Sequence, residues 1–314
     1  MLKSYHLFDK PLEELPQGKL LITTLNEHSY NVARKDPDFN AALKGSEVLL
    51  PDGISVVGAT RFLTGKKLKK IAGEDLFYFE MKRLQKQAVS GKGQAARAMF
   101  LGSTEKVLAK IKNRAALDFP NVEVFTYSPP YKPEFSEEDN AAMYKAIDEV
   151  QPDVLFIGMT APKQEKWAYK LVQSEKEVSS FEFRVPSSEN EIVQSLEYDE
   201  NEEVTSLEYG VLSKEKELKT QNSALSTPNS QLRTQNSSLR THHSTLSANC
   251  HVCCIGAVFD FYAGTVKRAP QWMIGAGLEW FYRLIKEPER MWRRYLIGNV
   301  KFVWRMVGEV RSKK

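Results

Sequence analysis

Five polar residues follow apolar runs of the sequence, at the positions where buried strands are predicted to end. Thr24 and Asn26 follow the first run, Asp52 the second, Gln164 a later one and Asp260 the last. The carboxyl ends of parallel strands share one edge of a sheet, so these side chains can line one cleft. Thr, Asn and Gln suit a polyhydroxylated ligand, and a single carboxylate can serve as a general base.

Each of these five residues also has a purely structural interpretation. Thr24 and Asn26 can cap the next helix, and Asp52 in a Pro-Asp-Gly sequence can be an ordinary turn residue. Gln164 can be a solvated residue in a first helical turn. Asp260, between two phenylalanines, can simply accept from a backbone N–H. Residue types alone leave both interpretations open.

Two further motifs resemble ligand sites. Asp36 and Asp38 form a DPD that resembles a metal-binding DxD, but they lie between helix-like segments, which favours a loop. The sequence GSTEK at Gly102 lacks the Lys-Ser/Thr ending of a P-loop. Gly102 nevertheless precedes a predicted helix whose N-terminal amides can bind a phosphate. We therefore retain Gly102 as a candidate and expect no metal site.

The three cysteines are clustered at Cys250, Cys253 and Cys254. An odd count with two adjacent members argues against a disulfide framework. His251 lies among them, but the spacing matches no common zinc pattern and no second ligand pair follows. Free cysteine is a common core residue, so this segment is predicted to be a buried strand.

Strand-like and helix-like segments alternate over the first 170 residues, which indicates the elements that position the candidate residues. A capping-box sequence, Ser136 to Asp139, opens a helix to about Val150, and Ser103 is placed to cap the helix after Gly102. The predicted strands cover residues 19–24, 47–50, 97–102, 122–127 and 153–158. This alternation predicts an α/β fold: a Rossmann-like, mostly parallel sheet with helices on both faces.

Residues 171–249 interrupt this pattern. The segment is polar, and heptads of the form TQNSALS start at Thr220, Thr227, Thr234 and Thr241. Each heptad offers only one leucine, so the apolar seam of a coiled coil is missing. We predict a low-complexity, disordered insertion. The chain then divides into a catalytic core over 1–170, the insertion, a last core strand and turn over 250–270, and a C-terminal appendage over 271–314.

Charge is concentrated at the C-terminus of the 314-residue chain. Residues 281–314 carry ten Lys/Arg and three Asp/Glu, a net charge of +7, whereas the whole chain carries +4. The rest of the chain is therefore at 4 − 7 = −3. A basic segment on a near-neutral body favours an anionic partner such as phosphate, nucleic acid or a membrane surface. The N-terminus lacks a signal-peptide pattern, so a cytoplasmic location is expected.

Several motifs occur together in an order that resembles one family. They are TTLN, LLPDGISVV, AGEDLF, FLGS, PDVLFIGMTAPKQEKW, GAVFDFYAGTVKRAP and GLEWFYRLIKEPERMWRRY. The chain resembles the WecG/TagA/CpsF glycosyltransferases along nearly its whole length outside the insertion. The resemblance implies transfer of an N-acetylmannosamine-type sugar from a UDP donor to N-acetylglucosamine on a polyprenyl diphosphate. It implies inversion at the anomeric carbon, no DxD-bound metal and no other cofactor.

The resemblance also implies roles for residues. The base falls on Asp52 and its supporting polar groups on Thr24, Asn26 and Gln164. Lys70 stands where the family usually has arginine, which keeps the charge and loses the bidentate fork. The appendage arginines implied to meet the diphosphates are Arg283, Arg290, Arg293 and Arg294. Gly102 and Asp260 complete the predicted substrate contacts.

The appendage is predicted to be an amphipathic helix that starts at Pro288. Its apolar residues recur at spacings of three and four: Trp292, Leu296, Val300, Val303, Val307 and Val310. Arg290, Arg294, Lys301 and Arg305 fall on an opposite stripe. The apolar face either meets an anionic membrane, with the enzyme peripheral on its inner face, or packs on the protein's own core. We expect the membrane; no nucleic-acid partner is expected, and a homo-oligomer stays open.

Two other functions compete with the transferase. If the insertion damages the site, the chain is a catalytically impaired, membrane-associated protein that still binds a sugar nucleotide. The α/β pattern alone also fits a dinucleotide-dependent oxidoreductase. No G-x-G-x-x-G follows the first predicted strand, which weighs against that alternative.

Overall fold

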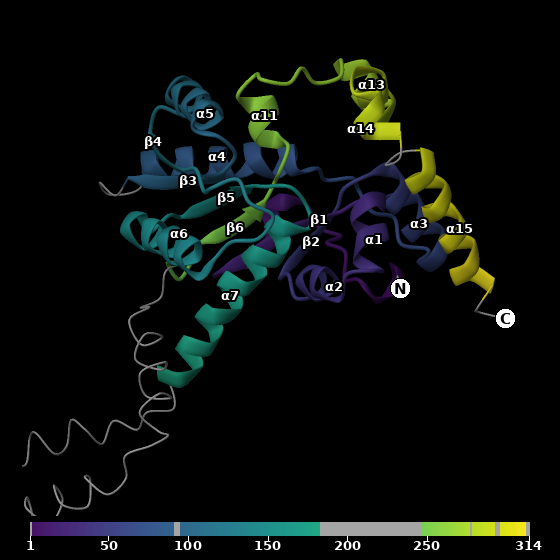
Figure 1. Cartoon of the computed structure of the whole chain (residues 1–314), viewed down its shortest axis with the longest axis horizontal. Helices are drawn as coiled ribbons and strands as arrows, with labels where there is room; N and C mark the ends of the chain where they lie inside the picture. The colour runs from purple at the N-terminus through teal and green to yellow at the C-terminus, as the bar shows by residue number, and fades with distance from the viewer. Residues whose placement is uncertain (1, 91–94, 183–245, 277, 293–295, 312–314) are drawn as a thin grey trace, which may run out of the picture. The chain divides into compact units, whose positions relative to one another are not determined.

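The computed structural model describes residues 2–90, 95–182, 246–276, 278–292 and 296–311. Its strands are β1 (Leu20–Leu25), β2 (Val48–Pro51), β3 (Ala96–Gly102), β4 (Val122–Tyr127), β5 (Val154–Gly158) and β6 (His251–Cys254). They form one sheet in the order β2-β1-β6-β5-β3-β4, in which each neighbouring pair is parallel (Figure 1). The predicted fold class, a Rossmann-like α/β sheet, is confirmed.

Helices connect the strands and cover both faces of the sheet (Figure 1). Those between strands are α1 (Glu27–Ala33), α2 (Pro37–Lys44), α3 (Ile54–Thr64), α4 (Gly73–Ser90), α5 (Glu105–Asp118), α6 (Glu137–Val150) and α7 (Lys163–Glu182). After β6 come α11 (Val258–Tyr262), α12 (Gln271–Gly275), α13 (Glu279–Lys286), α14 (Pro288–Trp292) and α15 (Gly298–Arg311). Two 3-10 turns, Leu2–Ser4 and Leu12–Glu14, precede β1.

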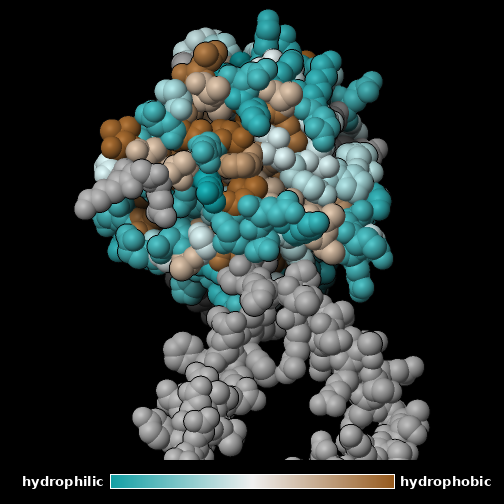
Figure 2. All heavy atoms as spheres, turned by 90° about the vertical axis from the view of Figure 1, so that its left-hand side faces the viewer, coloured by the Kyte–Doolittle hydropathy of each residue, from teal (hydrophilic) through white to brown (hydrophobic). Residues whose placement is uncertain are grey.

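Burial on both faces of the sheet explains why the strands are continuous apolar runs in the sequence. Alternate side chains point to opposite faces of the sheet. On one face Ile22, Phe100 and Phe156 pack against α4 and α11, and on the other Leu21 and Leu155 pack against α6 and α7. Both faces are therefore dry, as expected for a parallel sheet. Edge strand β4 is the exception, because most of its side chains are only half-buried. Seen from the side of β4, α5 and α6, apolar residues gather in the middle of a largely hydrophilic face (Figure 2).

Local sequence signals specify several helix ends. The predicted capping box is present at α6: Ser136 accepts from the backbone N–H of Asp139, and the Asp139 carboxylate accepts from that of Ser136. At α5 the prediction was wrong by one residue, because Thr104 and not Ser103 is the N-cap. Asp36 caps α2 by accepting from the N–H of Phe39 at 2.9 Å, which gives this DPD aspartate a structural role.

The helix α7 extends further than the sequence suggested. Its bounds are Lys163–Glu182, and Leu171 and Val172 are buried in the core although the predicted insertion began there. Leu246, near the other predicted boundary, is also buried. The described residues up to 175 and from 246 onward form one compact unit. Residues 183–245, which include most of the predicted insertion and its heptad repeats, lie outside the described residues, so their predicted disorder stays a prediction.

The C-terminal appendage is helical on both sides of a short stretch outside the described residues. Pro288 opens α14 (Pro288–Trp292), as expected, and α15 covers Gly298–Arg311. Residues 293–295 lie outside the described residues, so the single long helix from Pro288 stays a prediction. Helix α15 packs against α1 and α3 (Figure 1). None of the described helices combines the length and hydropathy that crossing a bilayer would require.

Candidate active site

Asp52 lies at the corner between β2 and α3. Its backbone N–H donates to the carbonyl of Leu25 at 3.0 Å, which ties the corner to the end of β1. Gly53 follows with φ of +122°, a value that favours glycine. A Cβ at Gly53 would lie 3.2 Å from Glu27 Oε2 and 3.6 Å from the Cβ of Asn26. The missing side chain of Gly53 therefore lets the start of α1 approach the catalytic candidate.

Lys70 is brought to the same corner by a backbone contact. The N–H of the next residue, Ile71, donates to the carbonyl of Pro51 at 3.0 Å, and Asp52 follows Pro51 directly. Lys70 is half-buried. An ammonium beside a carboxylate stabilises its ionised form. The structure thus places Lys70 near the candidate base.

Burial and four charges set the pKa of Asp52. Burial is the largest effect and raises the pKa of the half-buried carboxyl to about 6. Lys70 and Arg283 lower the pKa, whereas Glu27 and Glu279 raise it. A carboxylate with a pKa near 6 is ionised at neutral pH and is a stronger base than an ordinary aspartate.

Lys70→Met is expected to shift the acidic limb of the pH-rate profile to higher pH. Removing the ammonium removes the cation that most lowers the pKa of Asp52. The measurement is kcat/KM for sugar transfer between pH 5 and 8. Glu279→Gln is the matched variant, because removal of an acidic neighbour should move the same limb to lower pH. Identical limbs in all three proteins would contradict the assignment of this limb to Asp52.

Two residues of the appendage, Glu279 and Arg283, join residues of the core in an ion-pair cluster close to this corner. Glu279 accepts from Arg283 at 3.2 Å and pairs with Arg268 at 3.5 Å. Arg268 also pairs with Glu74 at the start of α4. Both guanidinium groups lie near the ring of Phe261, at 4.8 Å for Arg283 and 5.8 Å for Arg268. The cluster joins α13 to the catalytic core, and it holds two cations that an anionic substrate can attract.

The other predicted appendage arginines cannot be placed as Arg283 can. Arg290 is in α14, but its side chain is outside the described part of the chain. Arg293 and Arg294 are outside the described residues altogether. Their predicted contact with diphosphate stays a prediction.

Thr24 lies in β1, the strand paired with β2, and Asn26 directly follows the end of β1. Thr24 pairs in register with Leu50, which lies two residues before Asp52. The side chain of Thr24 is half-buried. Asn26 is the N-cap of α1: its Oδ1 accepts from the N–H of Ser29 at 2.9 Å. The capping interpretation of Asn26 therefore holds, although its Nδ2 is not needed for that role. Both residues lie within reach of the Asp52 corner.

Gln164 is at the start of α7, after β5, and it is 5% exposed. Its Nε2 donates to Glu165 Oε1 at 2.8 Å. Within the described chain, neither Gln164 Oε1 nor Glu165 Oε2 has a hydrogen-bond partner. Burial raises the pKa of Glu165 to about 7 against the opposing hydrogen bond from Gln164. The solvated interpretation of Gln164 is wrong, and a buried acid missed by the sequence analysis fixes its amide.

The two remaining candidates have clear local roles. Asp260 Oδ1 lies 3.2 Å from the hydroxyl of Thr265, in the turn after α11. Gly102 ends β3, and in the order β2-β1-β6-β5-β3 it is four strands away from Asp52. Four strand spacings amount to roughly 19 Å. Asp52 therefore follows the edge strand β2, whereas Gly102 ends β3, the second strand from the opposite edge.

Gly102→Ala is expected to destabilise the fold by at least about 2 kcal/mol. Its φ is +125°, and an added Cβ would lie 2.5 Å from the carbonyl oxygen of Gly158 on β5. Both the backbone conformation and the strand spacing would have to change. Urea denaturation measures the loss. Gly65→Ala is the control, since Gly65 also has positive φ but no atom within 4 Å of the added Cβ. Equal losses for the two variants would show that the contact with Gly158 is unimportant.

Sequence reasoning missed the acidic neighbours of Asp52 and the charged residues that pair with them. Glu27 directly follows Asn26, so proximity in the sequence was an available signal. Glu279 and Arg268 gave no such signal, because their meeting depends on how the appendage folds over the core. Glu74 was hidden in the AGEDLF motif.

The family model described as "Glycosyl transferase WecG/TagA/CpsF family" matches residues 4–179 and 231–314. These matched ranges contain Asp52, Lys70, Gln164 and the appendage.

Two curated bacterial proteins are similar over most of their length. Both are called N-acetylglucosaminyldiphosphoundecaprenol N-acetyl-beta-D-mannosaminyltransferase. The protein from Bacillus subtilis (strain 168) is 24% identical over 295 residues, which cover 94% of this chain and 81% of the relative. The protein from Bacillus spizizenii is 25% identical over 281 residues, which cover 89% of this chain and 76% of the relative.

Proposed function

Because the chain belongs to the WecG/TagA/CpsF family of glycosyltransferases, we propose that it transfers N-acetylmannosamine from a UDP donor. The proposed acceptor is N-acetylglucosamine on a polyprenyl diphosphate. The names of both relatives specify this sugar and this type of acceptor. The product would serve the synthesis of a cell-surface polysaccharide or a teichoic-acid-type polymer.

The observation that carries the chemistry is the environment of Asp52. A half-buried carboxylate with a pKa of about 6 lies on a rigid corner beside Lys70 and Arg283. We assign Asp52 as the base that removes the proton from the acceptor hydroxyl. That oxygen then attacks C1 of the donor sugar, and the bond from C1 to UDP breaks on the opposite side. A single base suffices for such an inverting displacement.

The surrounding residues have supporting roles in this proposal. Thr24, Asn26 and Gln164 offer hydroxyl and amide groups to the sugars, and the buried contact with Glu165 presets the amide of Gln164. Arg283 and the other appendage arginines are assigned to the diphosphates. In the structure Arg283 is held by Glu279 at 3.2 Å, so diphosphate would exchange one anionic partner for another. Charge-assisted hydrogen bonds to phosphate are strong enough to support this exchange.

We also propose that the appendage holds the enzyme at the inner face of the membrane. The apolar residues of the predicted lipid-facing stripe are exposed: Trp292, Leu296, Val300, Val303 and Val307 are 40%, 53%, 69%, 59% and 43% exposed. Other residues, Phe302 and Met306, bury the opposite side of α15. This division favours the membrane over the alternative in which the stripe packs on the core.

The decisive test is transfer of radiolabelled sugar from UDP-N-acetylmannosamine to a short-chain polyprenyl-diphosphate-N-acetylglucosamine. The expected product is a lipid-linked disaccharide formed by the wild-type chain. UDP-N-acetylglucosamine as donor and a chain with Asp52→Asn are the controls. Donor binding without any transfer by the wild type would replace this proposal with the catalytically impaired binding protein.

A further inference from the structure

The outer face of α3 is apolar although it is exposed. Ile54 and Phe62 are 56% and 74% exposed, and exposed Gly58 lies between them. Spacings of four place these three residues on one side of the helix. Val56 and Leu63, on the other side, are buried in the core. The exposed face is therefore distinct from the one that holds α3 in the fold.

The segment from Gly53 to Ile71 combines this apolar face with one-sided charge. It contains Arg61, Lys66, Lys67, Lys69 and Lys70 and no acidic residue. Arg61, Lys66, Lys67 and Lys69 are exposed, and only Lys70 turns in toward Asp52. An exposed helix with aromatic and aliphatic side chains on one face and flanking lysines is typical of a contact with a membrane surface.

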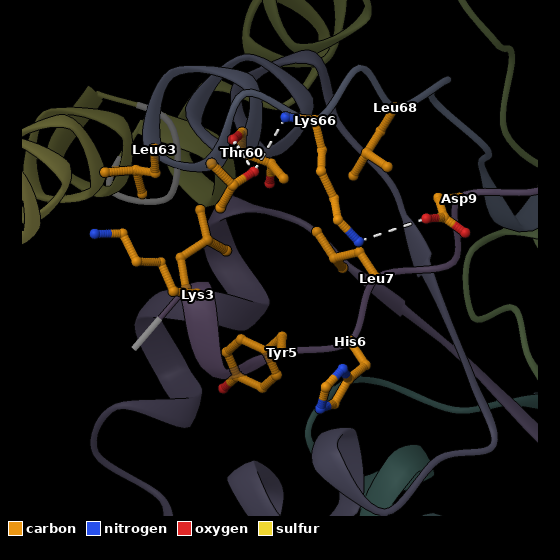
Figure 3. A pocket seen from close by; sticks show the side chains of 11 residues that line it. Lys3, Tyr5, His6, Leu7, Asp9, Thr60, Leu63, Lys66 and Leu68 are labelled. Carbon is orange, nitrogen blue, oxygen red and sulfur yellow. Dashed lines mark hydrogen bonds and ion pairs between the residues drawn. The ribbon is translucent and has the colours of Figure 1, made fainter.

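A pocket of about 450 Å³ adjoins this segment (Figure 3). The N-terminal residues Lys3, His6 and Leu7 form one side, and Leu63 and Lys66 form the other. Lys66 pairs with Asp9 at 3.6 Å, and both side chains are solvent-exposed. The pocket adds basic and apolar groups next to the same surface.

Helix α15 lies beside α3 (Figure 1). Its residues Val303 and Trp304 are 59% and 76% exposed. The apolar surface of α3 therefore has an apolar neighbour from the far end of the chain. Helix α3 also begins two residues after Asp52, so a partner on α3 would lie close to the catalytic corner.

We infer that α3 and the following lysines, residues 54–69, form a second membrane-docking surface that contacts anionic phospholipids. Phe62 and Ile54 enter the headgroup region, and Lys66, Lys67 and Lys69 lie against the lipid phosphates. Basic side chains near an anionic membrane surface each strengthen binding. This contact holds the catalytic corner at the level of the membrane where the diphosphate groups of lipid-linked acceptors lie. That role of the contact rests on the proposed function.

A site-specific dye tests the contact directly in the full chain. Phe62→Cys is labelled with an environment-sensitive fluorophore, and Leu117→Cys on α5, where Leu117 is 84% exposed, is the matched control. The native cysteines are buried, and burial raises the pKa of Cys250 to about 12, so they resist labelling. Vesicles with phosphatidylglycerol should shift the emission at position 62 to the blue and leave position 117 unchanged. No shift at 62 while the protein co-sediments with these vesicles would overturn the inference.

Variants of the exposed lysines test how much these residues contribute to vesicle binding. Changing Lys66, Lys67 and Lys69 to Gln should weaken binding to anionic vesicles by roughly one to two orders of magnitude. The control changes Lys106, Lys110 and Lys112 on α5, which are also exposed, and should have a much smaller effect. Equal losses would mean that net charge alone matters and would overturn the inference. Loss of binding to a soluble polyanion, with vesicle binding intact, would assign the surface to an acidic macromolecule instead.

Transfer to a short, water-soluble acceptor separates this inference from the proposed function. The triple lysine variant should keep wild-type transfer to that acceptor and lose transfer to a long-chain acceptor in vesicles. A wild-type chain that transfers no sugar to either acceptor would refute the proposed function, while the dye result would still decide the docking surface.

Discussion

Asp52→Asn should lower kcat for sugar transfer by roughly 10²–10⁴-fold, the usual range for loss of a general base. The amide keeps the shape of the side chain and cannot accept the proton of the acceptor hydroxyl. Donor affinity should change little, because Arg283 and the other donor contacts remain. Single-turnover kinetics with saturating donor would separate the chemical step from binding. A folded variant within a few-fold of the wild-type rate would exclude Asp52 as the base.

The same substitution should stabilise the protein at neutral pH. Burial raises the pKa of Asp52 from 3.8 to about 6 in the folded state. Ionisation therefore opposes folding: the stabilisation from the protonated group is complete below pH 4 and is lost as the pH rises through 6. The neutral amide avoids this loss, and the expected gain at pH 8 is about 1–2 kcal/mol after allowance for partial solvation. Melting temperatures of both proteins at pH 4 and pH 8 would check the sign.

Much of the fold and part of the site followed from local patterns. Apolar runs that end in polar residues are visible in the sequence, and the carboxyl edge of a parallel sheet must bring Thr24, Asn26 and Asp52 together. The register confirms this, because Leu25 pairs with Pro51 directly before Asp52. The capping box at Ser136 was likewise a local signal.

The unpredicted part of the site depends on contacts between distant segments. Arg268 and Glu279 meet only because the appendage folds over the start of α4. The role of Glu165 depends on burial, which no neighbour in the sequence specifies. The appendage was also misjudged in one respect: Arg305 was placed on a basic stripe with Arg290 and Arg294, whereas it donates a hydrogen bond to Asn31 on α1. A helical wheel shows which residues share one face of a helix. It does not show whether that face meets another helix of the fold or a different partner.

The two faces of α15 lead to opposite expectations for neighbouring residues. Phe302 is 2% exposed and contacts Tyr30 edge to face at 5.3 Å, in the cluster that also buries Met306. Phe302→Ala should therefore lower the free energy of unfolding by about 3–4 kcal/mol, through lost burial and the cavity left behind. Trp304 is 76% exposed. Trp304→Ser should leave the stability within about 0.5 kcal/mol and weaken binding to anionic vesicles, because tryptophan favours the membrane interface.

Urea denaturation and vesicle sedimentation of the two variants measure these expectations. Phe302→Ala, assayed well below its denaturation midpoint, should bind vesicles more tightly than Trp304→Ser does. Truncation after Glu287 would be a poor test of membrane binding, because it removes Phe302 and Met306 from the core together with the exposed face. It also removes Glu309, which accepts from the hydroxyl of Tyr30 at 2.6 Å. If Trp304→Ser instead lost as much stability as Phe302→Ala and kept wild-type vesicle binding, the outward face of α15 would be a packing surface, and membrane attachment would have to come from another part of the chain.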